Sequence, residues 1–168
     1  MRSSETFESE LTQLLPRLRR FAFALSRNGA DADDLAQTTV ERALRSRDQW
    51  QPGTRLDSWL YRIMRNLWID TVRARGRRDR HEAPEVAAKD VGEDPREAMH
   101  ASMELQRAMS AMERLPDEQR MAIALVLVEG LSYRDAAGAL DVPIGTLTSR
   151  LARGREALQA LLGDGAAE

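Results

Sequence analysis

The fold is decided by the stretch LSYRDAAGALDVPIGTLTSRLARGR, residues 131–155. Ser132 followed three residues later by Asp135 is typical of a helix start, and the apolar residues after them indicate one short helix. That helix should end just before Asp141, which tolerates the left-handed conformation that a tight turn needs. Pro143 cannot continue a helix but can begin one. The stretch therefore predicts two helices joined by a short turn.

The second of these helices carries an apolar face and a polar face. Ile144, Leu147 and Leu151 recur at i, i+3 and i+7, so we expect them to face inward. The polar face contains Thr146, Ser149, Arg150 and Arg153. Arg can donate two parallel hydrogen bonds to guanine, and Ser or Thr can bond a base edge or a phosphate. The pattern is typical of a helix-turn-helix that reads the DNA major groove, and the alternative is an ordinary helical hairpin with a solvated basic face.

Length and composition set limits on the class of protein. The chain has 168 residues, of which 31% are charged, 42% hydrophobic and 5% aromatic, and this balance favours small helical domains over one large core. It shows no run of 18 apolar residues and no secretion leader, so we expect a cytoplasmic protein without membrane insertion of its own. The absence of Cys excludes disulfides, thiolate zinc sites and a Cys nucleophile.

The formal net charge of −2 hides a segregation of charge. Residues 62–80 contain seven Arg and only two acids, whereas residues 79–98 contain seven acids and only three basic residues. The acidic stretch has no helical period and includes Pro and Gly, so it is interpreted as a flexible linker. We therefore predict an all-α protein with two small helical domains, at residues 5–78 and 103–163, and an acidic linker at residues 79–102.

The first predicted domain begins with a helix from about Glu5 to Leu15, after which Pro16 either opens a second helix or kinks the first. A turn at Asn28-Gly29 precedes a helix that runs to about Ser46, with a predicted buried stripe of Ala36, Val40, Ala43 and Leu44. Three acids near its start, Asp31, Asp33 and Asp34, are interpreted as helix-start residues; a carboxylate metal site is the alternative.

A long basic helix should follow. Thr54 and Asp57 indicate a second capping box, and the expected inner stripe of the helix is Leu56, Trp59, Leu60, Ile63 and Leu67. Trp59 is expected in the core, whereas aromatic rings beside Arg on other faces suit unstacked bases and phosphates.

The second predicted domain has four helices, the last two of which form the helix-turn-helix. Its first helix is expected from Met103 to Leu115, with the side chains of Leu105, Met109 and Met112 facing inward. Residues 121–128 are apolar almost all round and are expected to form a buried central helix, which Gly130 closes.

These motifs together resemble a bacterial sigma factor of the sigma-70 family, extracytoplasmic-function (ECF) group. The resemblance covers the chain from about Phe7 to Leu162, and it rests on DADDLAQTTVERAL, TRLDSWLYRIMRNLWIDTVRARGRR and LPDEQRMAIALVLVEGLSYRDAAGALDVPIGTLTSRLARGREAL, in that order. It implies a transcription initiation factor without enzymatic activity that binds core RNA polymerase and promoter DNA. An anti-sigma factor is a further implied partner.

The resemblance also implies roles for individual residues. The helix that docks on the polymerase clamp matches Asp34, Gln37 and Glu41. The segment that captures a flipped base of the −10 element and its adjoining helix match Trp50, Asn66 and Asp70, with Arg73 and Arg77 beyond them. The −35 helix matches Thr146, Ser149, Arg150 and Arg153, and Asp141 stands where the family usually has Gly.

Two other classes of function compete with this interpretation. A stand-alone regulator that binds operator DNA would need a two-fold dimer interface, and no long heptad repeat indicates one. An enzyme is less compatible still, because His81 and His100 have no nucleophile in their context and no phosphate-binding loop or metal motif is present. No catalytic residue, metal or cofactor is therefore expected.

Overall fold

The computed structural model describes residues 2–81 and 103–163, and it contains no β-strand in those two ranges. The N-terminal helices are α1 (Arg2–Ser26), α2 (Gly29–Arg45), the short 3-10 helix η1 (Arg47–Gln49) and α3 (Leu56–His81). The C-terminal helices are α5 (Met103–Glu113), α6 (Asp117–Ile123), the π-helical η2 (Ala124–Val128), α7 (Tyr133–Leu140) and α8 (Ile144–Gly163). The predicted all-α class is confirmed, whereas most of the predicted linker, residues 82–102, lies outside the described residues.

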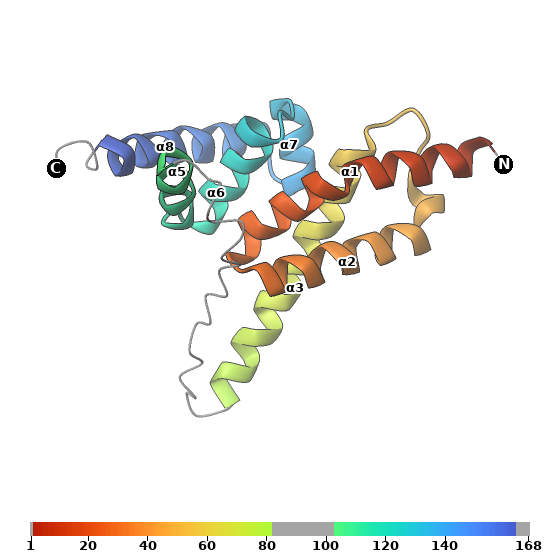
Figure 1. Ribbon diagram of the computed structural model, residues 1–168, viewed down its shortest axis with the longest axis horizontal. Helices are drawn as coiled ribbons and strands as arrows, with labels where there is room; N and C mark the ends of the chain where they lie inside the picture. The colour runs from red at the N-terminus through yellow and green to blue at the C-terminus, as the bar shows by residue number, and fades with distance from the viewer. Residues whose placement is uncertain (1, 82–102, 164–168) are drawn as a thin grey trace.

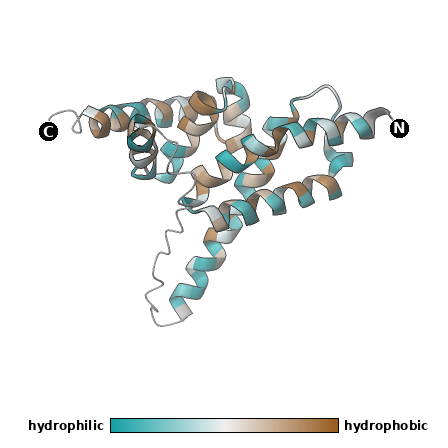
Figure 2. Ribbon diagram, viewed as in Figure 1, coloured by the Kyte–Doolittle hydropathy of each residue, from teal (hydrophilic) through white to brown (hydrophobic). Residues whose placement is uncertain are grey.

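The N-terminal helices pack as an antiparallel pair, α1 and α2, crossed by α3 (Figure 1). Pro16 lies inside α1, so of the two alternatives the first helix continues through it and no second helix begins there. The C-terminal half of α3 projects beyond the other helices, and Figure 2 shows this projecting part as mainly hydrophilic. Arg73 and residues 77–80 are exposed there, as the basic run in the sequence predicts.

One hydrophobic core runs through both groups of helices. It joins Leu18, Phe21 and Leu60 of α1 and α3 to Leu125 and Leu140 from the C-terminal helices, all with exposed fractions of 2% or less. The two groups, expected to be separate domains, are thus packed directly against each other. No helix among the described residues is long and apolar enough to cross a membrane.

Several residues expected in the core are exposed. Leu44, Leu105, Met109 and Ile144 have 44%, 51%, 43% and 50% of their surface accessible, so the expected inward orientation was wrong for them. Leu44 and Ile144 lie on the edges of their amphipathic stripes, where small rotations of a helix decide burial. Leu105 and Met109 are exposed because α5 buries a different face, which carries Ala111. Buried residues that the stripes omitted include Thr39, Tyr61 and Met64.

Two local expectations also need correction. The Thr54 hydroxyl donates to the Gln51 carbonyl at 2.7 Å instead of capping α3, which begins at Leu56. The apolar segment at residues 121–128 is only partly buried, because α6 gives way to the π-helical turn η2, which leaves Leu127 and Val128 exposed. Gly130 follows this turn with a φ of 71°, which agrees with its expected role as a helix-ending residue.

Candidate nucleic-acid interface

The turn before α8 is built by local hydrogen bonds that the sequence predicts. The Ser132 hydroxyl oxygen accepts the Asp135 N–H at 3.0 Å and caps α7. Asp141 ends α7 in the left-handed region with a φ of 55°, and the Val142 N–H donates back to the Ala137 carbonyl at 3.0 Å. Both features place α8 at a defined angle to α7, as a helix-turn-helix requires.

The inner face of α8 is anchored by Leu147 in the shared core and by Leu151 in a smaller cluster with Leu115 and Ile123. Leu147 and Leu151 are 0% and 1% exposed. Gly154, the residue after Arg153, lies so close to α6 that a Cβ added there would stand 2.9 Å from Cγ1 of Ile123. This close approach of α8 to α6 directs the opposite face of α8 towards solvent.

The predicted polar residues of α8 do lie on its outer side, but in two environments. Ser149 and Arg153 are exposed, and an Nη2 of Arg153 donates to the Ser149 hydroxyl at 3.3 Å. Thr146 is half-buried. Arg150 is only 20% exposed at its side chain, and its Nη2 lies 3.0 Å from Oε1 of Glu118 on α6. Arg153 is therefore the more accessible guanidinium, whereas Arg150 is tied to the body of the molecule.

A second polar row lies along α3. Asn66, Asp70, Arg73 and Arg77 are all exposed, and their spacing of four, three and four residues puts them on one face of the helix. The Asn66 side-chain oxygen accepts a hydrogen bond from Arg65 at 3.1 Å. The two N–H donors of the Asn66 amide group take no part in this bond. The structure thus brings together four of the five residues expected at the −10 element.

Trp50, the fifth of those residues, occupies a different environment. It is half-buried, and its ring centroid lies 5.5 Å from that of Phe7 on α1. Its indole N–H is buried and has no hydrogen-bond partner among the described residues. Part of the ring is therefore used to pack the loop after η1 onto α1.

Arg75 differs from Arg73 and Arg77 because it is paired with an acid of another helix. Its two Nη atoms donate to the Asp31 carboxylate, each at 2.9 Å, and its guanidinium lies 5.8 Å from the centroid of the Trp68 ring. The hydrogen bonds from Arg75 lower the pKa of Asp31, with a further contribution from Asn28. Asp33 similarly pairs with Arg19 at 2.8 Å, and no metal-binding group of acids and His occurs among the described residues.

The residues expected to dock on the polymerase share one exposed face of α2. Asp34, Gln37 and Glu41 are separated by three and four residues and are all exposed. The Gln37 amide donates to the Glu41 carboxylate at 3.2 Å. This face is thus acidic and accessible.

Sequence reasoning missed a buried charged cluster between the two groups of helices. The Glu129 side chain is 1% exposed, and it accepts hydrogen bonds from Arg17, Arg20 and the Tyr61 hydroxyl at 3.0–3.2 Å. Burial and the charge of Glu129 raise the pKa of Tyr61. In the sequence, Glu129 is a single acid between an apolar run and Gly130. This position alone does not indicate that its hydrogen-bond partners lie more than sixty residues away.

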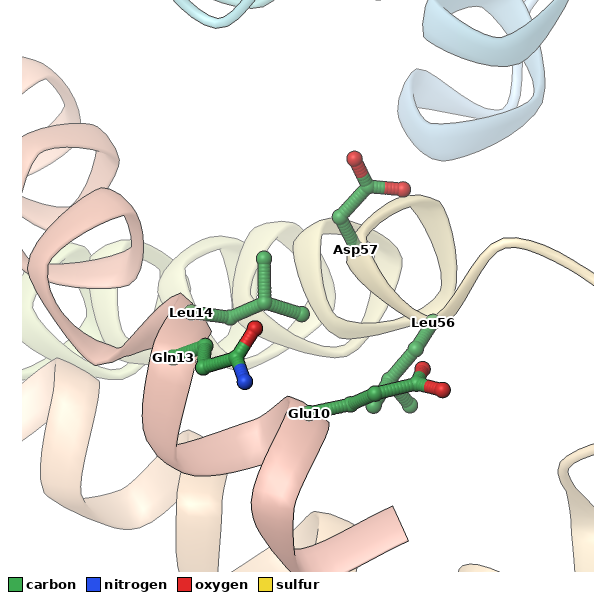
Figure 3. A pocket seen from close by; sticks show the side chains of 5 residues that line it. All are labelled: Glu10, Gln13, Leu14, Leu56 and Asp57. Atoms are coloured by element: carbon green, nitrogen blue, oxygen red, sulfur yellow. The ribbon is translucent and has the colours of Figure 1, made fainter. Parts of the chain in front are cut away.

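A small cavity lies between α1 and the start of α3, where Glu10, Gln13 and Leu14 face Leu56 and Asp57 (Figure 3). Its volume of about 210 Å³ is below the roughly 300 Å³ at which small-molecule pockets usually begin. The Asp57 carboxylate is already occupied by Arg55 at 2.7 Å and Arg17 at 3.2 Å. The cavity therefore has no evident ligand, and the accessible chemistry lies on the helix faces.

Comparison with known proteins gives two matches to family models. Residues 11–78 match Sigma-70 region 2, and residues 105–158 match Sigma-70, region 4. The ECF RNA polymerase sigma factor EcfG of Rhodopseudomonas palustris is 40% identical over 159 residues, which is 95% of this chain and 86% of that protein.

Solved structures agree with these matches. The sigma factor RpoE in complex with the anti-sigma factor NepR, from Bartonella quintana, superposes with a TM-score of 0.84 at 38% identity, over 95% of this chain and 98% of that one. CnrH in complex with the cytosolic domain of CnrY superposes with a TM-score of 0.70 at 25% identity, over 96% of this chain and 90% of that one.

Proposed function

Since the chain belongs to the ECF group of the sigma-70 family, whose members are alternative sigma factors that direct RNA polymerase to promoters, we propose that its two groups of helices divide promoter recognition between them. The C-terminal helices contact the −35 element, and the N-terminal helices bind core polymerase and the −10 element. The protein is an initiation factor and not an enzyme.

The observation that carries this proposal is the outer face of α8. Ser149 and Arg153 stand exposed on a helix that Leu147 and Leu151 anchor from behind. A helix presented in this way can enter the major groove, where Arg and Ser have base edges and phosphates within reach. We assign Thr146, Ser149, Arg150 and Arg153 to the −35 contact, with Arg150 towards the phosphate backbone.

The −10 contact is assigned to the exposed face of α3. Asn66 and Asp70 can bond the edge of an extruded base, and Arg73 and Arg77 can neutralise phosphates. Trp50 supplies a partly exposed ring beside the loop after η1. The docking of core polymerase is assigned to Asp34, Gln37 and Glu41 on α2, because acidic and amide side chains there are accessible.

An anti-sigma factor is a further proposed partner. The RpoE structure from Bartonella quintana and the CnrH structure each contain a bound partner protein, and both resemble this chain over at least nine-tenths of its length. Since core polymerase and promoter DNA are cytoplasmic in bacteria, we place this chain in the cytoplasm.

The test is reconstituted transcription with core polymerase on matched templates. Wild-type protein should give promoter-specific transcripts that core enzyme alone does not give. Asn66→Ala should lose open complex on duplex promoters but recover on templates pre-melted at −10, because the variant cannot hold the extruded base whose unstacking costs a few kcal/mol.

Arg65→Ala is the matched control for Asn66→Ala, because Arg65 neighbours Asn66 and bonds it but lies outside the assigned set. Equal losses of Asn66→Ala on duplex and pre-melted templates would show that Asn66 acts through folding or polymerase binding and not through the −10 base.

A further inference from the structure

The C-terminal half of α3 leaves the hydrophobic core well before the helix ends (Figure 1). Met64 is the last buried residue of α3, and Trp68, one turn later, packs against the core but is only partly buried. No residue from 69 to 80 is buried, although this part of the helix is about 18 Å long at roughly 1.5 Å per residue. A helix end with so few apolar contacts opens at low cost in free energy unless another interaction holds it.

A charged pair ties this part of α3 to the rest of the fold. The two Nη atoms of Arg75 donate to the two carboxylate oxygens of Asp31, each at 2.9 Å, and the Asn28 amide donates to one of these oxygens at 2.8 Å. The Arg75 guanidinium also lies 5.8 Å from the centroid of the Trp68 ring. Within the described residues, no other ion pair or side-chain hydrogen bond joins α3 beyond Trp68 to another element.

The Asp31–Arg75 pair lies on the side of α3 opposite the −10 row, by which we mean the exposed residues Asn66, Asp70, Arg73 and Arg77. At about 100° per residue, Arg75 is roughly 160° around the helix axis from both Arg73 and Arg77. Trp68, seven residues before Arg75, is within about 20° of it, so the two share the side that faces α2. Holding this side of α3 against the start of α2 therefore turns the −10 row away from the fold.

The acid of the pair belongs to the helix that carries the proposed polymerase-docking residues. Asp31 lies in the first turn of α2, three residues before Asp34. The side-chain oxygen of Asn28 accepts the Asp31 N–H at 2.8 Å, so the backbone of this turn is itself fixed. The pair thus sets the direction of the −10 row relative to the docking face of α2.

We infer that Arg75 is a positioning residue for −10 recognition: its bonds to Asp31 hold the projecting half of α3 so that Arg73 and Arg77 meet the promoter phosphates. The inference rests on the proposed assignment of the −10 contact to α3. Arg suits this task because its planar fork bonds both carboxylate oxygens at once, which a Lys ammonium does not. Phosphate contacts that are already in position need less ordering on binding, so the pair raises promoter affinity without touching the DNA.

The alternative is that Arg75 is a further phosphate contact, which Asp31 restrains in the absence of DNA. The two possibilities predict opposite effects of Asp31→Asn. A positioning pair makes Asp31→Asn weaken promoter binding, because the helix end loses its tie. A restrained phosphate contact makes Asp31→Asn strengthen binding, because the cation is released from its acid.

The first measurement is amide hydrogen exchange of the free protein, which needs neither polymerase nor promoter. Arg75→Ala and Asp31→Asn should accelerate exchange at residues 69–80 by about threefold to tenfold, the range expected for a charge-assisted bond at a partly exposed site. Arg75→Lys should give an intermediate rate. Arg78→Ala is the matched control and should leave exchange there unchanged, because Arg78 is exposed on the same part of α3 and makes no ion pair within the described residues.

The second measurement is binding of holoenzyme, reconstituted with core polymerase, to a fluorescently labelled promoter fragment at several salt concentrations. Arg75→Ala and Asp31→Asn should weaken binding by about threefold to tenfold and lower the slope of log affinity against log salt concentration. The affinity for core polymerase should stay unchanged. Asp33→Asn is the matched control for Asp31→Asn and should bind the promoter as wild-type protein does, because Asp33 lies at the same end of α2 but pairs with Arg19 of α1.

A cycle of combined variants separates positioning from a general loss of stability. If the pair acts through Arg73 and Arg77, breaking it should have no further effect on binding in a protein that already carries Arg73→Ala and Arg77→Ala. An equal loss in that background would overturn the positioning role. Stronger promoter binding by Asp31→Asn, or unchanged exchange and binding in both Asp31→Asn and Arg75→Ala, would overturn it as well. If wild-type protein gives no promoter-specific transcripts, the proposed function fails, whereas exchange at residues 69–80 still decides whether the pair holds α3.

Discussion

Gly154 shows how one missing side chain positions the recognition helix. A Cβ at this position would stand 2.9 Å from Cγ1 and 3.3 Å from Cδ1 of Ile123, so Gly154→Ala must displace α8 or repack the core. We expect the variant to be destabilised by about 1–3 kcal/mol, although Ala is the better helix former by about 1 kcal/mol. Urea denaturation of the variant and of wild-type protein measures this loss as a difference in the free energy of unfolding.

The control for Gly154→Ala is Gly138→Ala. Gly138 lies in α7 with no atom within 4 Å of an added Cβ, so its replacement should stabilise the protein slightly. If both variants are stabilised, the close approach of α8 to α6 does not constrain the fold.

Arg153 and Arg150 allow base reading to be separated from anchoring. Arg153 is exposed beside Ser149. Arg153→Ala should therefore weaken promoter binding by about 1–3 kcal/mol and relax the base preference at one position of the −35 element. Arg150 is held by Glu118, away from the base edges. Arg150→Ala should therefore weaken binding to all promoters alike and reduce the slope of log affinity against log salt concentration by about one unit. Transcription from a −35 library at two salt concentrations distinguishes the two. A changed sequence preference in Arg150→Ala alone would reverse the assignment.

At the residue scale, the local features of the helix-turn-helix were predicted correctly, although the equally local cap expected of Thr54 was wrong. The capping by Ser132 and the left-handed Asp141 depend on neighbours within a few positions, and both were predicted. The pairing of Arg150 with Glu118 and the packing of Trp50 on Phe7 were not, because each joins residues more than thirty positions apart. Such contacts depend on how helices pack, which residue spacing alone does not specify.

At the scale of elements, α2 and α3 are joined by the Asp31–Arg75 pair. The pKa of Asp31 is lowered from its ordinary value of 3.8, chiefly by the hydrogen bonds from Arg75. A lowered folded-state pKa stabilises the protein above pH 3.8, and this contribution is lost as the pH falls through the folded pKa. Asp31→Asn should therefore reduce stability at pH 7, and its difference from wild type should shrink below pH 3.8.

The measurement is the free energy of unfolding of both proteins between about pH 3 and pH 7. Asp33→Asn is the control, because Asp33 pairs with Arg19 at a largely exposed site where ion pairs contribute little. A difference between Asp31→Asn and wild type that persists unchanged at low pH would mean that Asp31 acts through its shape or its helix-start bonds and not its charge.

The presence of each described α-helix was predicted, whereas some boundaries and orientations were not: α1 runs from Arg2 to Ser26, although its end was expected near Leu15. The spacing of apolar residues identified each described α-helix, and α2 ends at Arg45, next to the expected Ser46. The predicted orientation of α5 was wrong, because Leu105 and Met109 were expected to face inward but lie on the exposed side of the helix. Short helices with apolar residues on several faces have no unique buried face, and their neighbours decide it.

At the scale of the whole molecule, the packing of the two groups was not predicted, and it changes the expected unfolding behaviour. Two domains on a linker would unfold independently in two steps. The buried core instead continues from α1 and α3 into the C-terminal helices, and the hydrogen bonds of Glu129 and Arg120 join them further. Cooperative units share buried contacts, so we expect wild-type protein to unfold in a single calorimetric transition.

Breaking the contact should separate this transition into two. Glu129→Ala removes the acceptor for Arg17, Arg20 and Tyr61 without shortening an apolar side chain of the shared core, so the contact weakens and the groups should then melt at different temperatures. Arg19→Ala should keep a single transition near that of wild type, because its pair lies within the N-terminal helices. Scanning calorimetry measures both, and the ratio of van't Hoff to calorimetric enthalpy should fall below one only for Glu129→Ala. Two transitions in wild-type protein would mean that the continuous core does not couple the groups.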